Sequence, residues 1–407
     1  MSTISASTTS TTAYKVTADT TGTLVLQTGA TPTTAVTVSS AQVVTLSQAL
    51  PEASGGTGTS TGYYGFKNRI INGAMVFDQR NAGASVTPTA DNTYTLDRWK
   101  TRNGGGAGRF SVIQSSTSAA NFPTSVLLTV TTTSAPSGVE IYGFEQDIEG
   151  YNITDFGWGT ANAQAVTLSF QVRSSLTGTY CISIRNSAAD RSYVAEFTIN
   201  SANTFETKTI TVPAITTGTW LSTNGAGLLF LVCLGSGSTR EGTAGSWQSS
   251  NIVATSNQVD WINTSSATFY ITGVQLEKGS TASSFDYRPI GTEFMLCQRY
   301  FEKSYDQGTA PATNTTTGTF NFSGASEGNG NVIVPIQYST KRTAPTLTGY
   351  LATGTSGSWN YERSGSSSTG SITFDRTSDR ESRAYIVVGS NFVAAYVYGH
   401  WIASAEL

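Results

Sequence analysis

The feature that most constrains the fold is a series of short segments in which apolar and polar residues alternate. AVTLSFQVR (residues 165–173), GTYCISIR (178–185) and YVAEFTI (193–199) each place three or four apolar side chains on one face of a strand. Gly, Asn and Ser clusters separate these segments, as they do in sandwiches of short antiparallel strands. We therefore predict an all-β fold in which residues 62–290 form a jelly-roll β-sandwich.

One apolar run lacks this alternation. GLLFLVCL (227–234) is continuous, which predicts a central strand covered on both faces. It is far shorter than the ~20 residues that cross a bilayer as a helix. The first residues, MSTISASTTSTTAYKV, have neither the basic nor the apolar region of an export signal. We expect no membrane insertion.

Residues 1–61 are dominated by Thr and Ser and contain short β-like runs such as GTLVLQTG. No single run looks able to bury a core alone, and such strands usually obtain one from neighbouring subunits or a docking partner. ASGGTG (53–58) has the composition of a flexible joint. We interpret residues 1–61 as a β-rich attachment segment followed by a linker.

A helix and a third domain are predicted after the sandwich. In GTEFMLCQRYFEKSY (291–305), Thr292 can cap a helix whose apolar stripe contains Phe294, Cys297, Phe301 and Tyr305. Strand-like runs then follow, and the last, NFVAAYVYGHWIAS, is apolar on both faces. We predict that residues 291–407 form a short helix and a C-terminal β-sandwich tip domain. The two-sided last strand suggests contact with other subunits.

Composition excludes several classes of partner. Charged residues are 12% of the chain, against roughly 25% in average proteins, and the net charge is -3. This balance provides no electrostatic footprint for nucleic acid or anionic lipid. The surface must be rich in hydroxyls and amides, as suits a protein outside a cell or on a particle. Three scattered cysteines, Cys181, Cys233 and Cys297, predict buried reduced thiols.

Several motifs resemble those of a known family. The chain contains ALPEASGGTGTSTG, NRIINGAMVFDQRNAG, TLDRW, QDIEGYNITDFGWGTANAQAVTLSFQVRSSLTGTY, ITGVQLEKGSTASSFDYRPIGTEFMLCQRYFEKSY, KRTAPTLT and WIASAEL, in that order. Together they resemble tail-fibre proteins of tailed bacteriophages with a carbohydrate-binding-module-like jelly roll. The resemblance implies a homotrimeric virion component, attached through its N-terminus to tail or baseplate proteins and contacting the host surface at its C-terminal end. It would be made in the host cytoplasm and act outside the cell.

Acidic residues offer an enzymatic alternative. FEQDIEGY places Glu145, Asp147 and Glu149 on one face of a strand, with neighbours about 7 Å apart. That spacing suits the two carboxyl groups of a glycosidase. The same row is also compatible with a solvent-facing strand or polar network, or with a calcium site of oxygen ligands. We expect no enzyme activity, and calcium is the one cofactor left open.

Other candidate chemistry is weaker. NGGGAGR (103–109) and GSGSTREG (235–242) are rich in glycine but lack the Lys-Ser/Thr ending of a phosphate-binding loop. His400 is the single histidine, so a zinc site is not expected. We predict that His400 is buried and hydrogen-bonded.

Aromatic residues could bind sugars. In GTSGSWNYERSGSS (354–367), Trp359 and Tyr361 project from a Gly/Ser-rich loop, with Asn360 and Arg363 nearby to bond hydroxyls. They are either loop anchors or a glycan platform. Trp99 and Trp261 are expected in the core, and the segments around Trp158 and Trp247 are weaker versions of the loop motif.

These observations favour a non-enzymatic phage receptor-binding protein, a tail fibre that attaches the virion to host cell-surface polysaccharide. Two alternatives remain open at this point: a capsid-attached head fibre or decoration protein, and a glycan depolymerase.

Overall fold

A computed structural model describes residues 5–6, 14–18, 23–28, 33–39, 41, 44–46, 66–326, 330–363, 365–389 and 395–407. The chain divides into two compact units, residues 1–67 and 68–407. The predicted joint at residues 53–58 lies outside the described residues. The all-β fold class is confirmed, and the described residues contain one α-helix. None of the helices described is long and apolar enough to cross a membrane.

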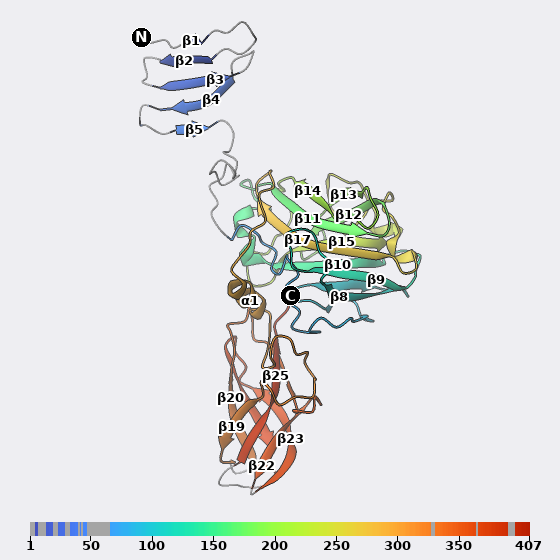
Figure 1. Cartoon of the computed structure of the whole chain (residues 1–407), viewed down its shortest axis with the longest axis vertical. Coiled ribbons are helices and arrows are strands. Elements are labelled where there is room, and N and C mark those ends of the chain that lie inside the picture. The colour runs from blue at the N-terminus through green and yellow to red at the C-terminus, as the bar shows by residue number, and fades with distance from the viewer. Residues whose placement is uncertain are drawn as a thin grey trace. The chain divides into compact units, whose positions relative to one another are not determined.

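The first unit contains a single antiparallel sheet in which every strand pairs with the next along the chain. Its strands, drawn in blue in Figure 1, are β1 (Ser5–Ala6), β2 (Tyr14–Ala18), β3 (Leu24–Thr28), β4 (Thr33–Val38) and β5 (Val44–Leu46). Among the residues of this sheet whose burial is described, which belong to β3, β4 and β5, none is buried.

The second unit begins with a sandwich of two antiparallel sheets (Figure 1). The seven-stranded sheet has the order β16 (Trp247–Gln248), β13 (Ser192–Ile199), β12 (Gly178–Arg185), β15 (Ala226–Ser236), β10 (Ile141–Glu149), β7 (Lys100–Gly104), β6 (Thr93–Tyr94). The five-stranded sheet has the order β14 (Glu206–Val212), β11 (Val166–Ser174), β17 (Thr268–Lys278), β9 (Ser125–Thr132), β8 (Arg109–Ser115). Four short 3-10 helices connect strands: η2 (Gly150–Asn152), η3 (Thr154–Phe156), η4 (Ser238–Arg240) and η5 (Trp261–Asn263).

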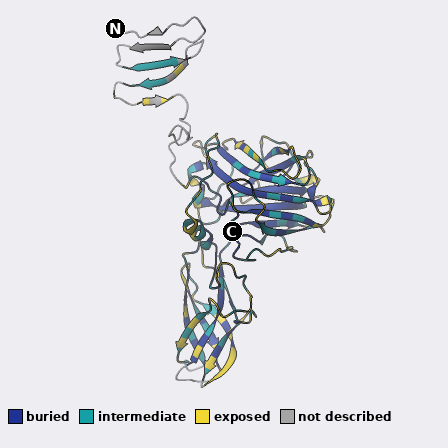
Figure 2. Ribbon diagram, in the orientation of Figure 1, coloured by how far each residue is buried: buried dark blue, intermediate teal, exposed yellow. Residues whose placement is uncertain are grey.

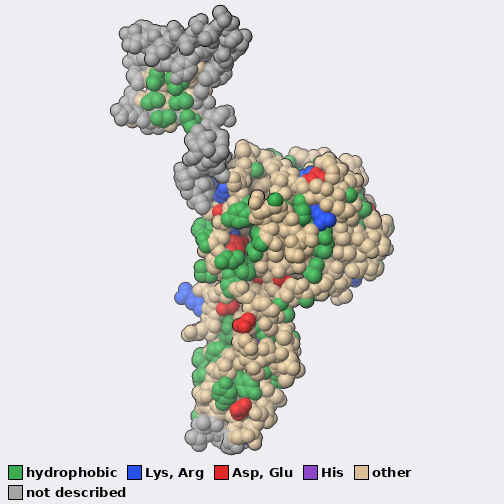
Figure 3. Space-filling view, viewed as in Figure 1, with side chains coloured by type: hydrophobic (Ala, Val, Ile, Leu, Met, Phe, Trp, Pro, Cys, Tyr) green, Lys and Arg blue, Asp and Glu red, His purple; other side chains and the backbone are tan. Residues whose placement is uncertain are grey.

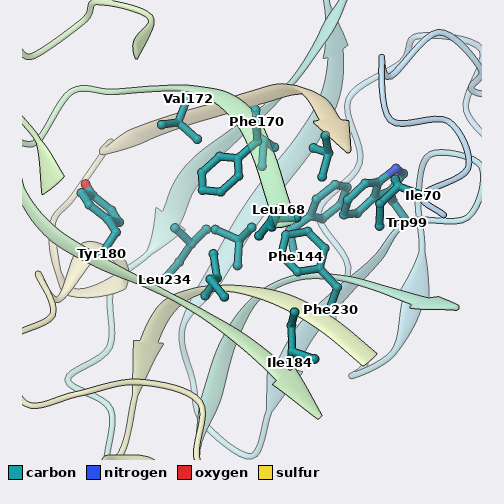
Figure 4. Packing of buried hydrophobic residues seen from close by; sticks show 14 of the residues in the cluster. Ile70, Trp99, Phe144, Leu168, Phe170, Val172, Tyr180, Ile184, Phe230 and Leu234 are labelled. Carbon is teal, nitrogen blue, oxygen red and sulfur yellow. The ribbon is translucent and has the colours of Figure 1, made fainter. Parts of the chain in front are cut away.

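The main core lies between the two sheets. The alternating apolar residues of β11 point into it, and the rings of Trp99 and Phe144 stack with centroids 5.1 Å apart (Figure 4). Trp261 contacts Phe110 edge-on in the same core. Both predicted core tryptophans, Trp99 and Trp261, are therefore confirmed.

Strand β15 explains the continuous apolar run. It lies between β12 and β10, with Phe230 directed into the sandwich core. On its other face, Leu231 and Cys233 pack against Ile252, Val253 and Ala254 from a covering loop. Figure 2 shows the resulting burial across the middle of both sheets. The prediction of a strand covered on both faces is confirmed.

Helix α1 (Ile290–Gln298) is shorter than predicted. The expected helix over 291–305 is wrong beyond Gln298, because Phe301–Lys303 form strand β18 and pair with the last strand of the chain. Thr292 is also not the cap, since Pro289 occupies that position without a side-chain hydrogen bond. The apolar residues that were expected to form one helical stripe belong to two consecutive elements. Phe294 and Cys297 lie in helix α1, and Phe301 lies in strand β18.

The C-terminal β-domain surrounds its own core. One continuous path of paired strands has the order β18 (Phe301–Lys303), β25 (Ala395–Ser404), β22 (Ser358–Arg363), β23 (Ser366–Asp375), β24 (Glu381–Val387), β20 (Asn331–Gln337), and β19 (Phe320–Gly324) and β21 (Thr346–Tyr350) also pair with β25. Strands of the same chain pair with β25, and Val397 and Trp401 are buried, whereas Tyr396 of the same strand is 40% exposed. Contact of this strand with other subunits stays a prediction.

The last residues join this domain to the sandwich. The Glu406 carboxylate forms ion pairs with Arg98 and Arg80, and the Tyr94 hydroxyl donates to the carbonyl of Leu407 over 2.8 Å. Both β-domains therefore belong to one compact unit. The predicted three-part boundaries at 61/62 and 290/291 stay predictions.

The three cysteines are free and buried, as predicted. Cys181 and Cys233 lie opposite each other on β12 and β15 beneath the covering loop. Burial raises the pKa of Cys181 to about 12, which makes its thiol unreactive at neutral pH.

Candidate functional site

The aromatic residues predicted to bind glycan do not form an open platform. Trp359 and Tyr361 lie in strand β22, not in a loop, and Trp359 is 0% exposed. The Trp359 indole donates to the carbonyl of His400 over 2.8 Å. Asn360 accepts from the Ala352 amide, and Arg363 donates to the Val388 carbonyl. The loop interpretation is wrong because the apolar-polar-apolar order of these residues belongs to a strand whose Gly/Ser flanks form turns.

The three acidic residues of β10 do share one face, the outer face of the seven-stranded sheet. That face is not exposed to solvent there, because all three carboxylates are buried. Glu145 forms ion pairs with Lys100, Arg102 and Arg185. Of the alternatives predicted for this row, the structure shows the polar network.

The other two acids have their own cations. Lys100 contacts Asp147 over 2.5 Å, while Glu149 accepts from Arg299 over 2.6 Å and from Tyr300 over 2.7 Å. Cations thus occupy positions that calcium would need. The described residues contain no group of three or more His, Cys, Asp or Glu side chains that could bind a metal.

The two central carboxyls respond differently to this environment. Burial alone would raise the pKa of Glu145, but Arg185, Arg102 and Lys100 outweigh it and lower that pKa below its usual value. Burial and the neighbouring Glu145 raise the pKa of Asp147 to about 6. The network is charged, compact and closed to a polymeric substrate.

His400 is buried and hydrogen-bonded, as predicted. Its ring stacks on Tyr305 with centroids 3.6 Å apart, and its nitrogens contact the Ser304 hydroxyl and the Thr315 carbonyl. Burial lowers the pKa of His400 below its usual 6.5.

This pKa predicts a pH-dependent stability. The unfolded chain protonates the imidazole at a higher pH than the folded chain, so His400 contributes stability that is lost as pH falls through its lowered pKa. We expect wild type to lose free energy of unfolding relative to His400→Phe between about pH 7.5 and about pH 5. Urea unfolding of both proteins at each pH measures this difference. Parallel pH profiles would contradict it.

A different surface combines aromatic rings with unpaired polar groups. On the outer face of the five-stranded sheet, Ile113 pairs with Leu127, Leu127 with Tyr270, and Tyr270 with Arg173. Phe205 directly precedes β14, where Glu206 pairs with Val172 beside Arg173. These five half-buried side chains form a line across all five strands, which we call the transverse row. In Figure 3 a column of hydrophobic side chains crosses the sandwich domain.

Arg173 is the polar centre of the transverse row. Its guanidinium carbon lies 4.8 Å from the Tyr270 ring centroid and 6.0 Å from that of Phe205. No ion pair or hydrogen bond joins its side chain to any other described residue, and its Nε is buried without a partner. The guanidinium is therefore held by aromatic rings while its N–H groups remain available to a ligand.

Hydroxyl and amide groups flank the row. Ser169 and Gln171 lie on the same face of β11 as Arg173, and they pair with Thr209 and Thr207 of β14, respectively. The Gln171 amide donates to the Thr207 hydroxyl over 2.8 Å. This part of the face offers neutral hydrogen-bonding groups beside an aromatic and cationic line.

An aromatic cluster covers the other part of the same face. Phe122, Phe285 and Tyr287 contact one another with ring centroids 4.9–5.7 Å apart. Phe122 packs on Gly273, which has a φ of +60°. A Cβ atom at position 273 would lie 2.5 Å from the Phe122 ring. A pocket of about 140 Å³ lies beside the cluster, and Tyr287 is 58% exposed at its edge.

Sequence reasoning missed the transverse row. Its members are up to 157 residues apart, from Ile113 to Tyr270, and only strand pairing aligns them. One signal was present in the sequence. Arg173 and Tyr270 lie on the faces of their strands that point away from the core, where the residues two positions away are Gln and Thr. An aromatic ring at such a position indicates a surface role.

Comparisons with known proteins give distant structural matches. No protein-family model and no curated protein matches the chain. A putative sugar binding protein from Bacteroides thetaiotaomicron is similar over 52% of this chain and 99% of its own, with 11% identity and a TM-score of 0.29. The CBM22-1 xylan-binding domain of Paenibacillus barcinonensis Xyn10C is similar over 50% and 99%, with 13% identity and a TM-score of 0.24.

The enzymatically active domain of bacteriophage CBA120 tailspike protein 4 is similar over 52% of this chain and 21% of its own, with 15% identity and a TM-score of 0.24. At such scores these similarities carry no argument about what this chain binds.

Proposed function

We propose that this chain is a non-enzymatic carbohydrate-binding protein whose glycan site is the outer face of the five-stranded sheet. The observation that carries the proposal is the transverse row, in which Arg173 lies against Tyr270 and Phe205 with its side-chain N–H groups unpaired. Sugars present C–H faces that pack on aromatic rings and oxygens that accept from guanidinium groups. The hydroxyl and amide groups beside the row supply further hydrogen bonds.

The carboxylates support a binding role over a hydrolytic one. A glycosidase needs two carboxyl groups that face one scissile bond. Glu145 and Asp147 instead face Lys100, Arg102 and Arg185 and are buried. The proposed protein therefore retains polysaccharide without cleaving it.

In its finer form, the proposal is a receptor-binding tail fibre of a tailed phage. Residues 1–61 would attach a homotrimer to tail or baseplate proteins, and the rest would contact host cell-surface polysaccharide. The motif resemblance supports this assignment. Several copies per particle would raise avidity without any new contact, so each single site can be weak.

Substitutions in the transverse row test the glycan site. We expect Tyr270→Ala and Arg173→Ala each to weaken binding to host-surface polysaccharide at least tenfold, or about 1.4 kcal/mol. Arg173→Lys should also weaken it, because lysine keeps the charge but loses the planar contact with the rings. Binding is measured by biolayer interferometry on immobilised neutral and acidic polysaccharides.

The matched control is Tyr151→Ala, which removes a tyrosine that is 61% exposed in η2, outside the five-stranded sheet. It should bind like wild type. Unchanged binding by folded Tyr270→Ala and Arg173→Ala would refute the site. Loss only on acidic polysaccharides would identify a carboxylate as the group that Arg173 recognises.

A further inference from the structure

On the outer face of the five-stranded sheet, the charge of Arg173 has no anion beside it. The outward positions of the five strands, as far as the structure describes them, include one carboxylate, that of Glu277. Glu277 pairs with Thr167, which is six residues from Arg173 along β11, or about 20 Å away. It is 2% exposed and accepts hydrogen bonds from Gln275 and Ser283. Glu277 therefore does not neutralise Arg173.

The acid next to the transverse row is also occupied. Glu206 pairs with Val172, so its side chain leaves the sheet on the side opposite to Arg173. Its carboxylate contacts the Lys208 ammonium over 2.6 Å and accepts from the backbone amides of residues 200–201 over 2.8 Å. Arg173 is thus a half-buried cation without a counter-ion among the described residues.

The surroundings of this cation match a carboxylate. The rings of Tyr270 and Phe205 lie 4.8 and 6.0 Å from the guanidinium carbon and exclude water from it, which strengthens its attraction to a negative charge. A guanidinium binds a planar carboxylate through two parallel N–H···O bonds, which are about twice as strong as bonds between neutral groups. The Tyr270 hydroxyl has no hydrogen-bond partner among the described residues, so it can donate to the same ligand.

We propose that the glycan bound at this site is acidic and that the carboxylate of a sugar acid pairs with Arg173. The inference rests on the proposed function and names the class of ligand for the same site. The carboxylate sugar would lie over β11 between the rings of Tyr270 and Phe205, and neighbouring sugars would extend along the row over Leu127 and Ile113. A neutral glycan would cover the Arg173 charge without compensating it, which costs free energy.

Carboxyl reduction tests the inference without changing the sugar chain. Polygalacturonate, alginate and hyaluronan are immobilised beside copies in which each carboxyl group has been reduced to a primary alcohol. Biolayer interferometry with the full chain then measures both affinities at low ionic strength. We expect at least one of these acidic polysaccharides to bind at least tenfold more tightly than its reduced copy, and added salt to diminish the difference.

Two variants assign the preference to Arg173. Arg173→Gln retains a planar hydrogen-bonding group without the charge, so it should bind the acidic and reduced forms with equal affinity. The matched control, Arg191→Gln, removes the same charge from a side chain that is 27% exposed between β12 and β13, outside the five-stranded sheet. It should keep the wild-type preference. Thermal unfolding of both variants checks that they are folded.

The outcomes separate acid recognition from the glycan site itself. Equal affinity of wild type for every acidic polysaccharide and its reduced copy would overturn acid recognition, while weaker binding of both by Tyr270→Ala would still support the site. Wild type that binds none of the three acids also overturns the inference, as does folded Arg173→Gln with an unchanged preference. Tighter binding to dextran sulfate than to all three would assign Arg173 to a sulfate ester, against the carboxylate.

Discussion

Glu145→Gln is expected to lower the free energy of unfolding by about 3–5 kcal/mol, because it removes the carboxylate shared by two buried cations, Lys100 and Arg185, and the half-buried Arg102. Glu145 is fully buried and contacts Lys100, Arg102 and Arg185. Glutamine preserves the volume but cannot neutralise these cations. Lys100 would keep Asp147 and Arg102 would keep Asp91, but no other ion pair is formed by Arg185 among the described residues. Urea unfolding monitored by tryptophan fluorescence measures the change.

Two comparisons isolate the cause of this loss. Glu362→Gln makes the same substitution at an exposed position of strand β22 and should change the free energy of unfolding by less than ~0.5 kcal/mol. Adding Arg185→Met to Glu145→Gln should restore part of the stability, because one unpaired buried cation becomes an apolar group. A Glu145→Gln protein as stable as Glu362→Gln would show that the network is solvated and not a closed ionic core.

Trp359→Ala is expected to lower the free energy of unfolding of the C-terminal β-domain by about 3–5 kcal/mol. The indole is fully buried and packs near Phe320 with ring centroids 6.0 Å apart. It fills the space above Gly399, where a Cβ would come within 2.5 Å of its ring. Alanine would leave a cavity and remove the hydrogen bond to the His400 carbonyl. Thermal unfolding measures the loss.

Tyr396→Ala is the matched control for Trp359→Ala. Tyr396 is an aromatic residue of β25 that is 40% exposed, so its truncation should cost much less. Any loss of glycan binding by Trp359→Ala should accompany unfolding of the domain. A stable Trp359→Ala protein that specifically lost binding would restore the interpretation of residues 354–367 as a glycan loop.

Much of the fold was predictable because local alternation sets which side chains of a strand face the same way. The outward and inward positions of β11, the covered strand β15 and the burial of Trp99 and His400 all follow from residues next to one another in the chain. The same local reasoning failed at Phe301, where one apolar spacing is compatible with both a helix and a strand.

The candidate site was not predictable, because a strand does not encode its neighbours. Glu145 was correctly placed on one face of β10, but whether that face meets water depends on the cations and loops that cover it. Within β22, Trp359 occupies a position whose side chain faces the core. The loop was predicted only because Gly and Ser residues flank the segment.

The sequence by itself determined that this chain forms strands and which positions of each strand are apolar. Only the tertiary structure decided that Ile113, Leu127, Tyr270, Arg173 and Phe205 lie in one line and that the acids of β10 are enclosed. The physical reason is that the side-chain period of two is a local property of the backbone. Strand order, register and covering loops arise from contacts between residues a hundred or more positions apart.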